Sequence, residues 1–156
     1  MLFRSQGANI NDSVQNHEQA ELLRLFEANV SFISDHVKIL MEHDLIKSKG
    51  RVVILSSIWE LLTRQDKFAY TVTKAAVGGL VRSLAVDLGS AKGILVNGIL
   101  PGIVDTPMSR GLLKPEQIDA VINGTPTGRM LIPSDIGNAV YLLASELNSE
   151  IGRAHV

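Results

Sequence analysis

Cysteine is absent from this chain of 156 residues. Disulfides, iron–sulfur clusters and thiolate zinc sites are therefore excluded, and nothing in the chain indicates export to an oxidising compartment. Long apolar runs are missing as well. The longest stretches, such as residues 94–104, are interrupted by Asn97, Gly98 and Pro101 and are too short to span a bilayer. We therefore expect a cytoplasmic protein that does not enter a membrane.

An excess of charge of one sign is also missing. The net charge is −1 and no basic run is present, so the chain has no electrostatic footprint for nucleic acid or for an anionic membrane surface. Metal binding is not expected, because His36 and His43 have no carboxylate or third histidine at ligand spacing. With 46% hydrophobic residues, the composition is typical of one soluble globular domain.

Three polar side chains form the most informative pattern. Tyr70 stands four residues before Lys74, and Ser57 stands thirteen residues before Tyr70. The apolar, β-branched run 52–56 predicts a buried strand that ends in two serines. Residues 68–88 carry apolar side chains at helical spacing, so Tyr70 and Lys74 lie one turn apart on the same face of a helix.

This pattern predicts a specific chemistry. A tyrosine with its ordinary pKa of about 10 exchanges protons poorly at neutral pH, but a cation nearby stabilises the phenolate and lowers the pKa. Tyr70 beside Lys74 then becomes a general acid/base, while Ser57 holds a substrate oxygen. These are the roles that interconversion of a carbonyl and an alcohol needs. Taken alone, Tyr-x-x-x-Lys is more often a lysine stem lying along a half-buried ring.

The segment after the helix extends the pattern. A strand at 94–100 follows, and the helix between the two strands is long enough for a parallel crossover. Pro101 and Gly102 then lie at the carboxyl end of that strand, where parallel sheets place functional residues. Residues 103–132 predict a long loop with a short helix at 115–122, a kind of segment that covers a ligand.

The segment before the first strand predicts two helices. Asp12 and Ser13 suggest a cap for an amphipathic helix at 17–26, and a second helix is expected at 28–45.

Three residues need a packing explanation. Gly78 and Gly79 inside the long helix cost about 1 kcal/mol each relative to alanine, so we expect another helix to approach them closely. Trp59, the only tryptophan, either borders the substrate or, as is commoner, packs the fold.

Together these motifs resemble the short-chain dehydrogenase/reductase family. Ser57, Tyr70 and Lys74 have the spacing of the family's catalytic residues. The other matching segments are Asn29 in an upstream helix, the strand and Pro-Gly turn at 94–102, and the loop 126–136 that leads into a last helix. The resemblance covers about residues 7–149 and implies a Rossmann-type doubly wound parallel sheet, of which this chain holds the second half.

The resemblance also implies roles for individual residues. Tyr70 would be the acid/base, Lys74 would lower its pKa and bind the nicotinamide ribose with it, and Ser57 would orient the substrate. Asn29 would distort its helix and hold a water in a proton relay; the alternative for Asn29 is a helix cap. Further contacts to the nicotinamide end of NAD or NADP are implied for Gly102, Val104 and Thr106.

The implied substrate is a small carbonyl or alcohol, in a reaction like that of a 3-oxoacyl reductase. The long loop offers an apolar wall of Met108, Leu112, Leu113 and Met130. It also offers three cations that could meet an anionic group or simply face solvent, namely Arg110, Lys114 and Arg129. A homodimer or homotetramer is implied through the helices 28–45 and 68–88, with Val77, Leu80, Val81 and Leu84 as the apolar hint. A non-catalytic module that only associates through these helices is the alternative function.

The Gly-rich turn that receives the cofactor pyrophosphate in such folds does not occur in this sequence. At most, Gly7, Ala8 and Asn9 match the tail of the family's Asn-Asn-Ala-Gly segment. We therefore interpret residues 6–149 as the C-terminal part of a single NAD(P)-binding domain, and expect the chain by itself to be inactive.

Both termini resemble translated sequencing-adapter sequence. Residues 150–156 can be encoded by GAG ATC GGA AGA GCA CAC GTC, and residues 1–5 by GTG CTC TTC CGA TCT with GTG as the start codon. The second string lies in the reverse complement of the same adapter. We interpret both ends as adapter-derived and assign His155 no role.

The first prediction is that residues 6–149 alone bind neither NAD nor NADP measurably and fold poorly, because the pyrophosphate site and neighbouring strands are missing. Calorimetric titration with each cofactor measures this. The control is the full-length protein, meaning this segment joined to its own N-terminal half. Saturable low-micromolar binding to a cooperatively melting 6–149 segment would show that the domain begins elsewhere.

Overall fold

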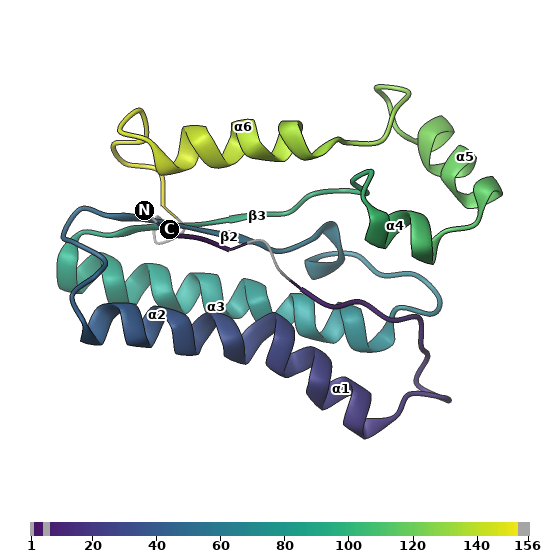
Figure 1. Ribbon diagram of the computed structural model, residues 1–156, viewed down its shortest axis with the longest axis horizontal. Helices are drawn as coiled ribbons and strands as arrows, with labels where there is room; N and C mark the ends of the chain where they lie inside the picture. Colours follow the sequence, from purple (N-terminus) through teal and green to yellow (C-terminus); the bar gives the residue numbers. More distant parts are fainter. Residues whose placement is uncertain (1, 5–6, 153–156) are drawn as a thin grey trace.

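The computed structural model describes residues 2–4 and 7–152 and shows an α/β fold (Figure 1). Its sheet is parallel, with the strands in the order β1 (Leu2–Arg4), β2 (Arg51–Leu55) and β3 (Leu95–Ile99). The predicted strands at 52–56 and 94–100 are thus confirmed to within one residue at each end. The predicted α/β class with parallel strands is confirmed as well.

Helices cover both faces of this sheet. The elements are α1 (Gln19–Phe26), the π-helical η1 (Glu27–Ser31), α2 (Phe32–Glu42), the 3-10 helix η2 (Ile58–Glu60), α3 (Phe68–Lys92), α4 (Pro107–Leu112), α5 (Pro115–Gly124) and α6 (Pro133–Ala144). In Figure 1, α2 and α3 lie on one face of the sheet and α6 on the other, while α4 and α5 lie beyond one end of the strands. α3 is the crossover that joins β2 to β3. The sequence missed α4 and predicted α5 correctly.

The core lies between the sheet and α3. Val52 pairs with Val96 in the register of β2 and β3, and both are completely buried. Together with Ile54 they belong to one apolar cluster with helix residues from α2 and α3. Val53, also completely buried, points to the other face because side chains alternate along a strand. α6 packs on that face.

α3 is longer than the sequence indicated. The helical spacing in the sequence ended at residue 88, but the helix runs to Lys92 and stops at Gly93, whose φ of 65° is left-handed. Glycine takes this conformation without steric cost, which is why it commonly ends helices.

The close approach predicted at Gly78 comes from a single side chain. A Cβ added at Gly78 would overlap the Glu60 carboxylate, which reaches over from η2. The approaching group is therefore a glutamate of a three-residue helix rather than a neighbouring long helix. An added Cβ at Gly79 meets only the tip of Arg82, at 3.9 Å, so the expectation of a tight contact at Gly79 is wrong within this chain.

Asp12 has a different role from the one predicted. We expected it to cap the following helix, but its Oδ1 accepts a hydrogen bond from the Ala69 amide at 3.0 Å, and its carbonyl accepts one from the Phe68 amide at 3.1 Å. Asp12 therefore satisfies the first amides of α3 from a distant part of the chain. The N-cap position of α1 is Glu18, without a side-chain cap.

The ends of the chain contact the sheet. Leu2–Arg4, which we had set aside as adapter-derived, pairs with Val52, Val53 and Ile54 as β1. The Asn97 side chain donates to the Ile151 carbonyl at 2.8 Å. Residues 1, 5, 6 and 153–156, including His155, lie outside the described residues. The adapter origin of both ends stays a prediction, since pairing does not depend on the source of a segment.

No helix in the described ranges has the length and apolar character that a bilayer span requires.

The role of Asp12 gives a stability prediction. In the full-length protein, Asp12→Ala removes the acceptor of the Ala69 amide and should lower the free energy of unfolding by about 1 kcal/mol, within the 0.5–2 kcal/mol typical of helix caps. Asp12→Asn keeps an acceptor oxygen and should lose less. Urea denaturation measures both, with Asp87→Ala on the exposed side of α3 as the control. An equal, negligible loss in all three variants would contradict the capping role.

Candidate functional site

The carboxyl ends of β2 and β3 meet at one edge of the sheet. After Leu55 the chain turns outward through Ser56 and Ser57, and the Ile58 amide donates to the Pro101 carbonyl at 2.9 Å. This bond joins the turn after β2 to the turn after β3. The Ser57 hydroxyl accepts from the Trp59 amide at 3.4 Å as η2 begins.

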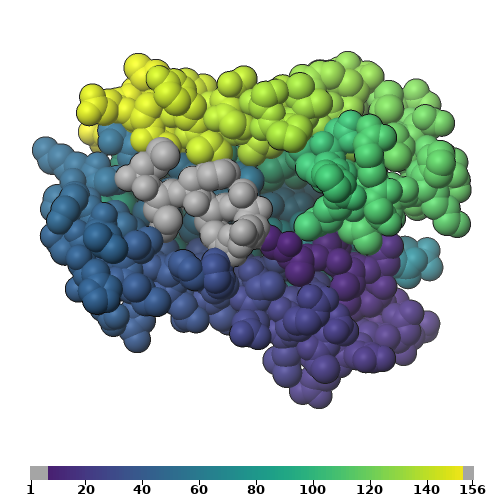
Figure 2. Space-filling view, viewed as in Figure 1, coloured from purple at the N-terminus to yellow at the C-terminus, as the bar shows by residue number. Residues whose placement is uncertain are grey.

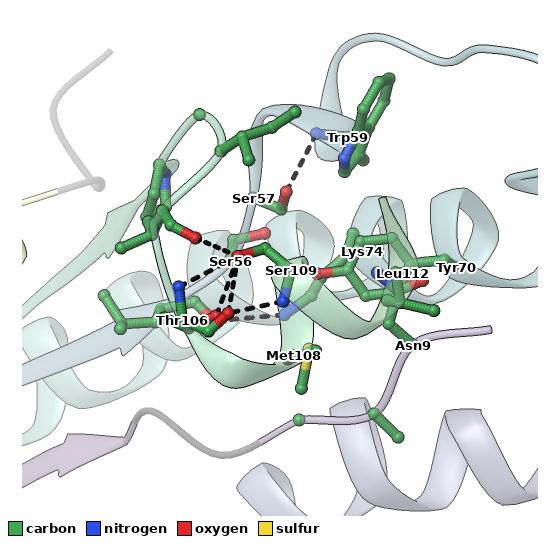
Figure 3. Close-up of a pocket in the computed structure, with 17 residues that line it drawn as sticks. Asn9, Ser56, Ser57, Trp59, Tyr70, Lys74, Thr106, Met108, Ser109 and Leu112 are labelled. Carbon is green, nitrogen blue, oxygen red and sulfur yellow. Dashed lines mark hydrogen bonds between the residues drawn. The ribbon is translucent and has the colours of Figure 1, made fainter. Parts of the chain in front are cut away.

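A cleft of about 200 Å³ opens at this edge. Its walls come from four segments: the loop 7–9, the end of β2 with η2, the first turns of α3, and the chain 101–112 (Figure 3). The N-terminal segment reaches this edge between α1 and the part of the chain around α4, as Figure 2 shows in purple. The cleft therefore depends on segments far apart in the sequence.

Of the four residues predicted to be catalytic, Ser57, Tyr70 and Lys74 line this cleft, whereas Asn29 does not. Tyr70 and Lys74 project from α3, and Ser57 comes from the end of β2. The Lys74 ammonium lies 5.6 Å from the centroid of the Tyr70 ring and 3.4 Å from the Leu55 carbonyl oxygen. Lys74 is almost completely buried. The fold thus assembles the predicted constellation around one space.

The pKa of Tyr70 moves in the direction opposite to our expectation. Burial of the ring raises its pKa above the usual value, and a hydrogen bond with Ser57 opposes this rise. We expected Lys74 to lower the pKa, but its ammonium lies over the ring face and is directed to the Leu55 carbonyl. In this state Tyr70 is a protonated phenol at neutral pH.

Ser56 is a lining residue that the sequence did not single out. It is 7% exposed, and its hydroxyl has no hydrogen-bond partner among the residues the structure describes. A buried, unpaired hydroxyl in a cleft wall is available to a ligand. The sequence could have indicated Ser56, because two serines follow each other at the strand end and the alternation of side chains points them in different directions.

The residues implied to contact a nicotinamide also line the cleft. An added Cβ at Gly102 meets no atom within 4 Å, so this stretch of backbone is open to a ligand. Val104 lies opposite Leu131 in a parallel bridge whose hydrogen bonds are made by the Ile103 carbonyl and the Asp105 amide. The amide of Val104 itself therefore points away from Leu131. Thr106 instead caps α4: its hydroxyl accepts from the Ser109 amide at 3.3 Å.

Asn29 lies behind the cleft rather than in its wall. It sits in the π-helical turn η1, so the predicted distortion of its helix is observed. Its Oδ1 accepts from the Ala8 amide at 2.8 Å, and its Nδ2 donates to the Ala8 carbonyl and to the Thr73 hydroxyl, each at 3.0 Å. These bonds join the loop 7–9 to α3 and do not cap a helix end, so the capping alternative is wrong.

Comparison with known proteins agrees with this geometry. Residues 2–155 match the model of a family described as enoyl-(acyl carrier protein) reductase. The 7α-hydroxysteroid dehydrogenase of Escherichia coli is 35% identical over 127 residues, which are 81% of this chain and 49% of that protein. The chain belongs to the short-chain dehydrogenase/reductase family. It spans about half the length of the curated relatives it matches.

Solved structures of the family share the fold. The gluconate 5-dehydrogenase of Burkholderia cenocepacia, in complex with NADP and tartrate, has a TM-score of 0.90 at 23% identity. The match covers 97% of this chain and 60% of that one. A 3-oxoacyl-[acyl-carrier protein] reductase of Brucella melitensis with bound NAD has a TM-score of 0.85 at 22% identity, covering 97% and 57%. The Rossmann-type fold that the resemblance implied is therefore confirmed.

Only some of the residues predicted to form an apolar substrate wall line the cleft. Met108 and Leu112 line the cleft, whereas Met130 is buried elsewhere. Of the three loop cations, Arg110 pairs with Asp105 and Arg129 with Asp135, while Lys114 is exposed outside the lining. None of these cations faces the cleft.

Three residues near the cleft were given no role by the sequence: Lys67 and Ser109, which it did not single out, and Asn9, which it named only in the partial match at residues 7–9. Asn9 and Ser109 line the cleft, and the buried ammonium of Lys67 lies 5.6 Å from the centroid of the Tyr70 ring. Lys67 stands three residues before Tyr70, on the same side of the helix, and that spacing was the available signal. Within the described residues, no group of three or more potential metal ligands occurs.

The contact between Gly7 and Asn29 gives a third prediction. A Cβ on Gly7 would lie 2.9 Å from the Asn29 Oδ1 and 3.8 Å from the Lys74 Nζ. Because three hydrogen bonds hold Asn29, Gly7→Ala in the full-length protein should cost about 1–3 kcal/mol of stability, as overpacking does. Denaturant unfolding measures it. Gly102→Ala, which adds the same methyl group in open space, should change stability by less than about 0.5 kcal/mol. Equal losses would contradict the assigned contact.

Proposed function

We propose that the protein to which this chain belongs is an NAD(P)-dependent oxidoreductase that interconverts a carbonyl and an alcohol. The observation that carries this proposal is the meeting of Ser57, Tyr70 and Lys74 around one cleft at the carboxyl ends of β2 and β3. Family membership supports the same reaction class.

The residues present fit the nicotinamide end of the cofactor. The open backbone at Gly102, the amide of Val104 and the free hydroxyl of Ser56 offer space and hydrogen-bonding groups to a carboxamide and ribose. Tyr70 and Lys74 would bind the ribose, and Thr106 would contribute from the start of α4. When bound, the nicotinamide supplies or accepts the hydride. Nothing in these residues distinguishes NAD from NADP.

The proton chemistry belongs to Tyr70. A substrate carbonyl oxygen between the hydroxyls of Ser57 and Tyr70 would receive two hydrogen bonds. As the carbonyl carbon is reduced, Tyr70 gives its proton to the developing alkoxide and becomes a phenolate. The positive charge of Lys74 stabilises that phenolate. In the reverse direction the phenolate takes the alcohol proton.

Asn29 would support this chemistry without touching the substrate. It holds the Ala8 backbone and the Thr73 hydroxyl, and Thr73 immediately precedes Lys74. We include Asn29 in the proposed relay because its Oδ1 and the Lys74 Nζ both lie close to Gly7.

The fourth prediction tests Tyr70 in the full-length protein. Tyr70→Phe removes only the hydroxyl and should lower kcat by about 10²- to 10⁴-fold, the usual contribution of a general acid/base. Nicotinamide absorbance measures turnover with the best alcohol or ketone in a substrate panel. The control is Tyr141→Phe on the exposed face of α6. Unchanged turnover in Tyr70→Phe would refute the assignment.

A pH profile separates the role of Ser57 from simple loss of structure. The hydrogen bond from Ser57 lowers the pKa of Tyr70. Ser57→Ala should therefore raise that pKa. Because alcohol oxidation needs the Tyr70 phenolate, the rising limb of its pH profile should move to higher pH, in addition to a lower rate. If this limb lies at the same pH in Ser57→Ala as in the wild type, the proposed coupling of the two hydroxyls is wrong.

We further propose that the full-length protein is a homodimer or homotetramer through α2 and α3. Val77 and Val81, which had suggested this surface, are buried in the core of the chain itself. The exposed apolar side chains of these helices are Ile39, Val72 and Val86, at 50%, 41% and 56% exposure. The open side of Gly79 also permits close contact.

The proposed assembly can be tested directly. Light scattering of the full-length protein at micromolar concentration should give the mass of a dimer or tetramer, because the exposed apolar residues of α2 and α3 favour burial. Val86→Glu, which places a charge on that surface, should shift the mass toward the monomer. A strictly monomeric wild type would refute the proposal.

A further inference from the structure

A second and smaller cleft adjoins the cleft at Tyr70. It has a volume of about 60 Å³, and five residues line both spaces: Asn9, Trp59, Ile103, Ser109 and Leu112. Its other lining residues are Arg64, Lys67 and Leu113. A water molecule takes up about 30 Å³ in the liquid, so the volume of the small cleft corresponds to about two waters. This is enough room for a group of the size of a carboxylate.

Lys67 places a buried cation in this small cleft. The residue is 3% exposed, and its ammonium donates to the Asn9 Oδ1 at 3.0 Å and to the Asn11 Oδ1 at 2.7 Å. Both partners are neutral amides. An ammonium has three donors, and no third acceptor is bonded to it within residues 7–152. A buried charge without a counter-charge in direct contact is costly, so an anion in this cleft would be stabilised.

Arg64 adds a second positive charge to the same wall. Its guanidinium carbon lies 5.7 Å from the centroid of the Trp59 ring, and its side chain forms no ion pair in the described part of the chain. Among the residues that the structure describes, no aspartate or glutamate lines either cleft. The described lining of the two joined clefts thus holds the cations Arg64, Lys67 and Lys74 and no carboxylate.

Asp12 is the carboxylate whose charge acts on Lys67, but among the described residues it forms no ion pair with Lys67 or Arg64. Its Oδ1 is bonded to the Ala69 amide and its side chain lines neither cleft. Burial and, to a smaller extent, the charge of Arg64 lower the pKa of Lys67, and Asp12 opposes them; the pKa that results is about 8. An anion bound next to the Lys67 ammonium would stabilise the charged form and so offset the effects of burial and of Arg64 on its pKa.

We propose that the small cleft is a subsite for an anionic group of the substrate, held by Lys67 and Arg64. This inference rests on the proposed function and names its substrate class. The Lys67 ammonium lies only 5.6 Å from the centroid of the Tyr70 ring, so the anionic group sits within a few bonds of the reacting carbon. The substrate is then a short hydroxy acid or the matching oxo acid. Arg64 and Lys67 take the place of the loop cations that the sequence suggested.

The competing explanation is that Lys67 only ties the loop at Asn9 and Asn11 to the start of α3. A structural tie affects stability but does not distinguish a carboxylate from a neutral amide of the same shape. The ratio of the two affinities therefore separates the explanations.

The experiment uses the full-length protein and two pairs of probes: lactate with lactamide, and 3-hydroxybutyrate with 3-hydroxybutyramide. Calorimetry at one fixed ionic strength, with cofactor present, gives each dissociation constant. At least one carboxylate should bind on the order of tenfold to 100-fold more tightly than its amide, because charge-assisted hydrogen bonds are the stronger ones. Equal affinities within both pairs, or no carboxylate binding up to tens of millimolar, would overturn the subsite.

Three variants locate the preference. Lys67→Met should reduce the carboxylate-to-amide ratio about tenfold, and Arg64→Gln should reduce it severalfold. Lys114→Met removes the same charge from an exposed position outside both clefts and should keep the wild-type ratio. If Lys67→Met does not melt cooperatively, Arg64→Gln, which changes an exposed side chain, decides the test. A wild-type ratio in Arg64→Gln, or in a folded Lys67→Met, would overturn the assignment.

Turnover is measured separately by nicotinamide absorbance. A protein that prefers carboxylates but oxidises no alcohol and reduces no ketone would refute the proposed function and leave the anion subsite standing. A protein that turns over alcohols but binds carboxylate and amide equally would refute the subsite alone.

Discussion

The parallel pairing of β2 and β3 requires a crossover, and α3 supplies it. Because both strands run in the same direction, their carboxyl ends lie at one edge, and the crossover helix begins near that edge. Ser57 and the first turns of α3 are brought together for this reason. The packing of Val52 and Val96 against α3 holds the arrangement, since these residues lie in its fully buried core.

The loop after Gly7 is the second element on which the cleft depends. Three side chains attach it to the helices: Asn29 bonds Ala8, Lys67 bonds Asn9 and Asn11, and Asp12 caps the start of α3. Each of these contacts spans more than 20 residues of sequence. The loop is therefore a wall of the cleft whose position is set by polar contacts rather than by apolar packing.

The electrostatics of the site follow from burial. Burial raises the pKa of Tyr70 and lowers that of Lys67, since in each case the charged form is the one that loses hydration. The site therefore holds a neutral phenol beside two lysines. This arrangement favours proton donation from Tyr70 and suits a substrate that brings negative charge.

The sequence by itself determined β2, β3, the long helix and the spacing of Ser57, Tyr70 and Lys74, but not β1. These features are local: alternation, helical periodicity and i,i+4 spacing are properties of short windows. The family resemblance added Asn29 and the Pro-Gly turn, because both are also marked by residue type at a fixed distance.

Only the tertiary structure decided the partners of Asp12, Asn29, Glu60 and Lys67. Asp12 caps a helix 56 residues away rather than the next one, and Glu60 fills the space over Gly78. The same holds for charge: Arg110 and Arg129 are used in ion pairs, while Lys67 and Arg64 face the small cleft. Hydrogen bonds and ion pairs depend on distances across the fold, and sequence periodicity carries no information about which distant groups will meet.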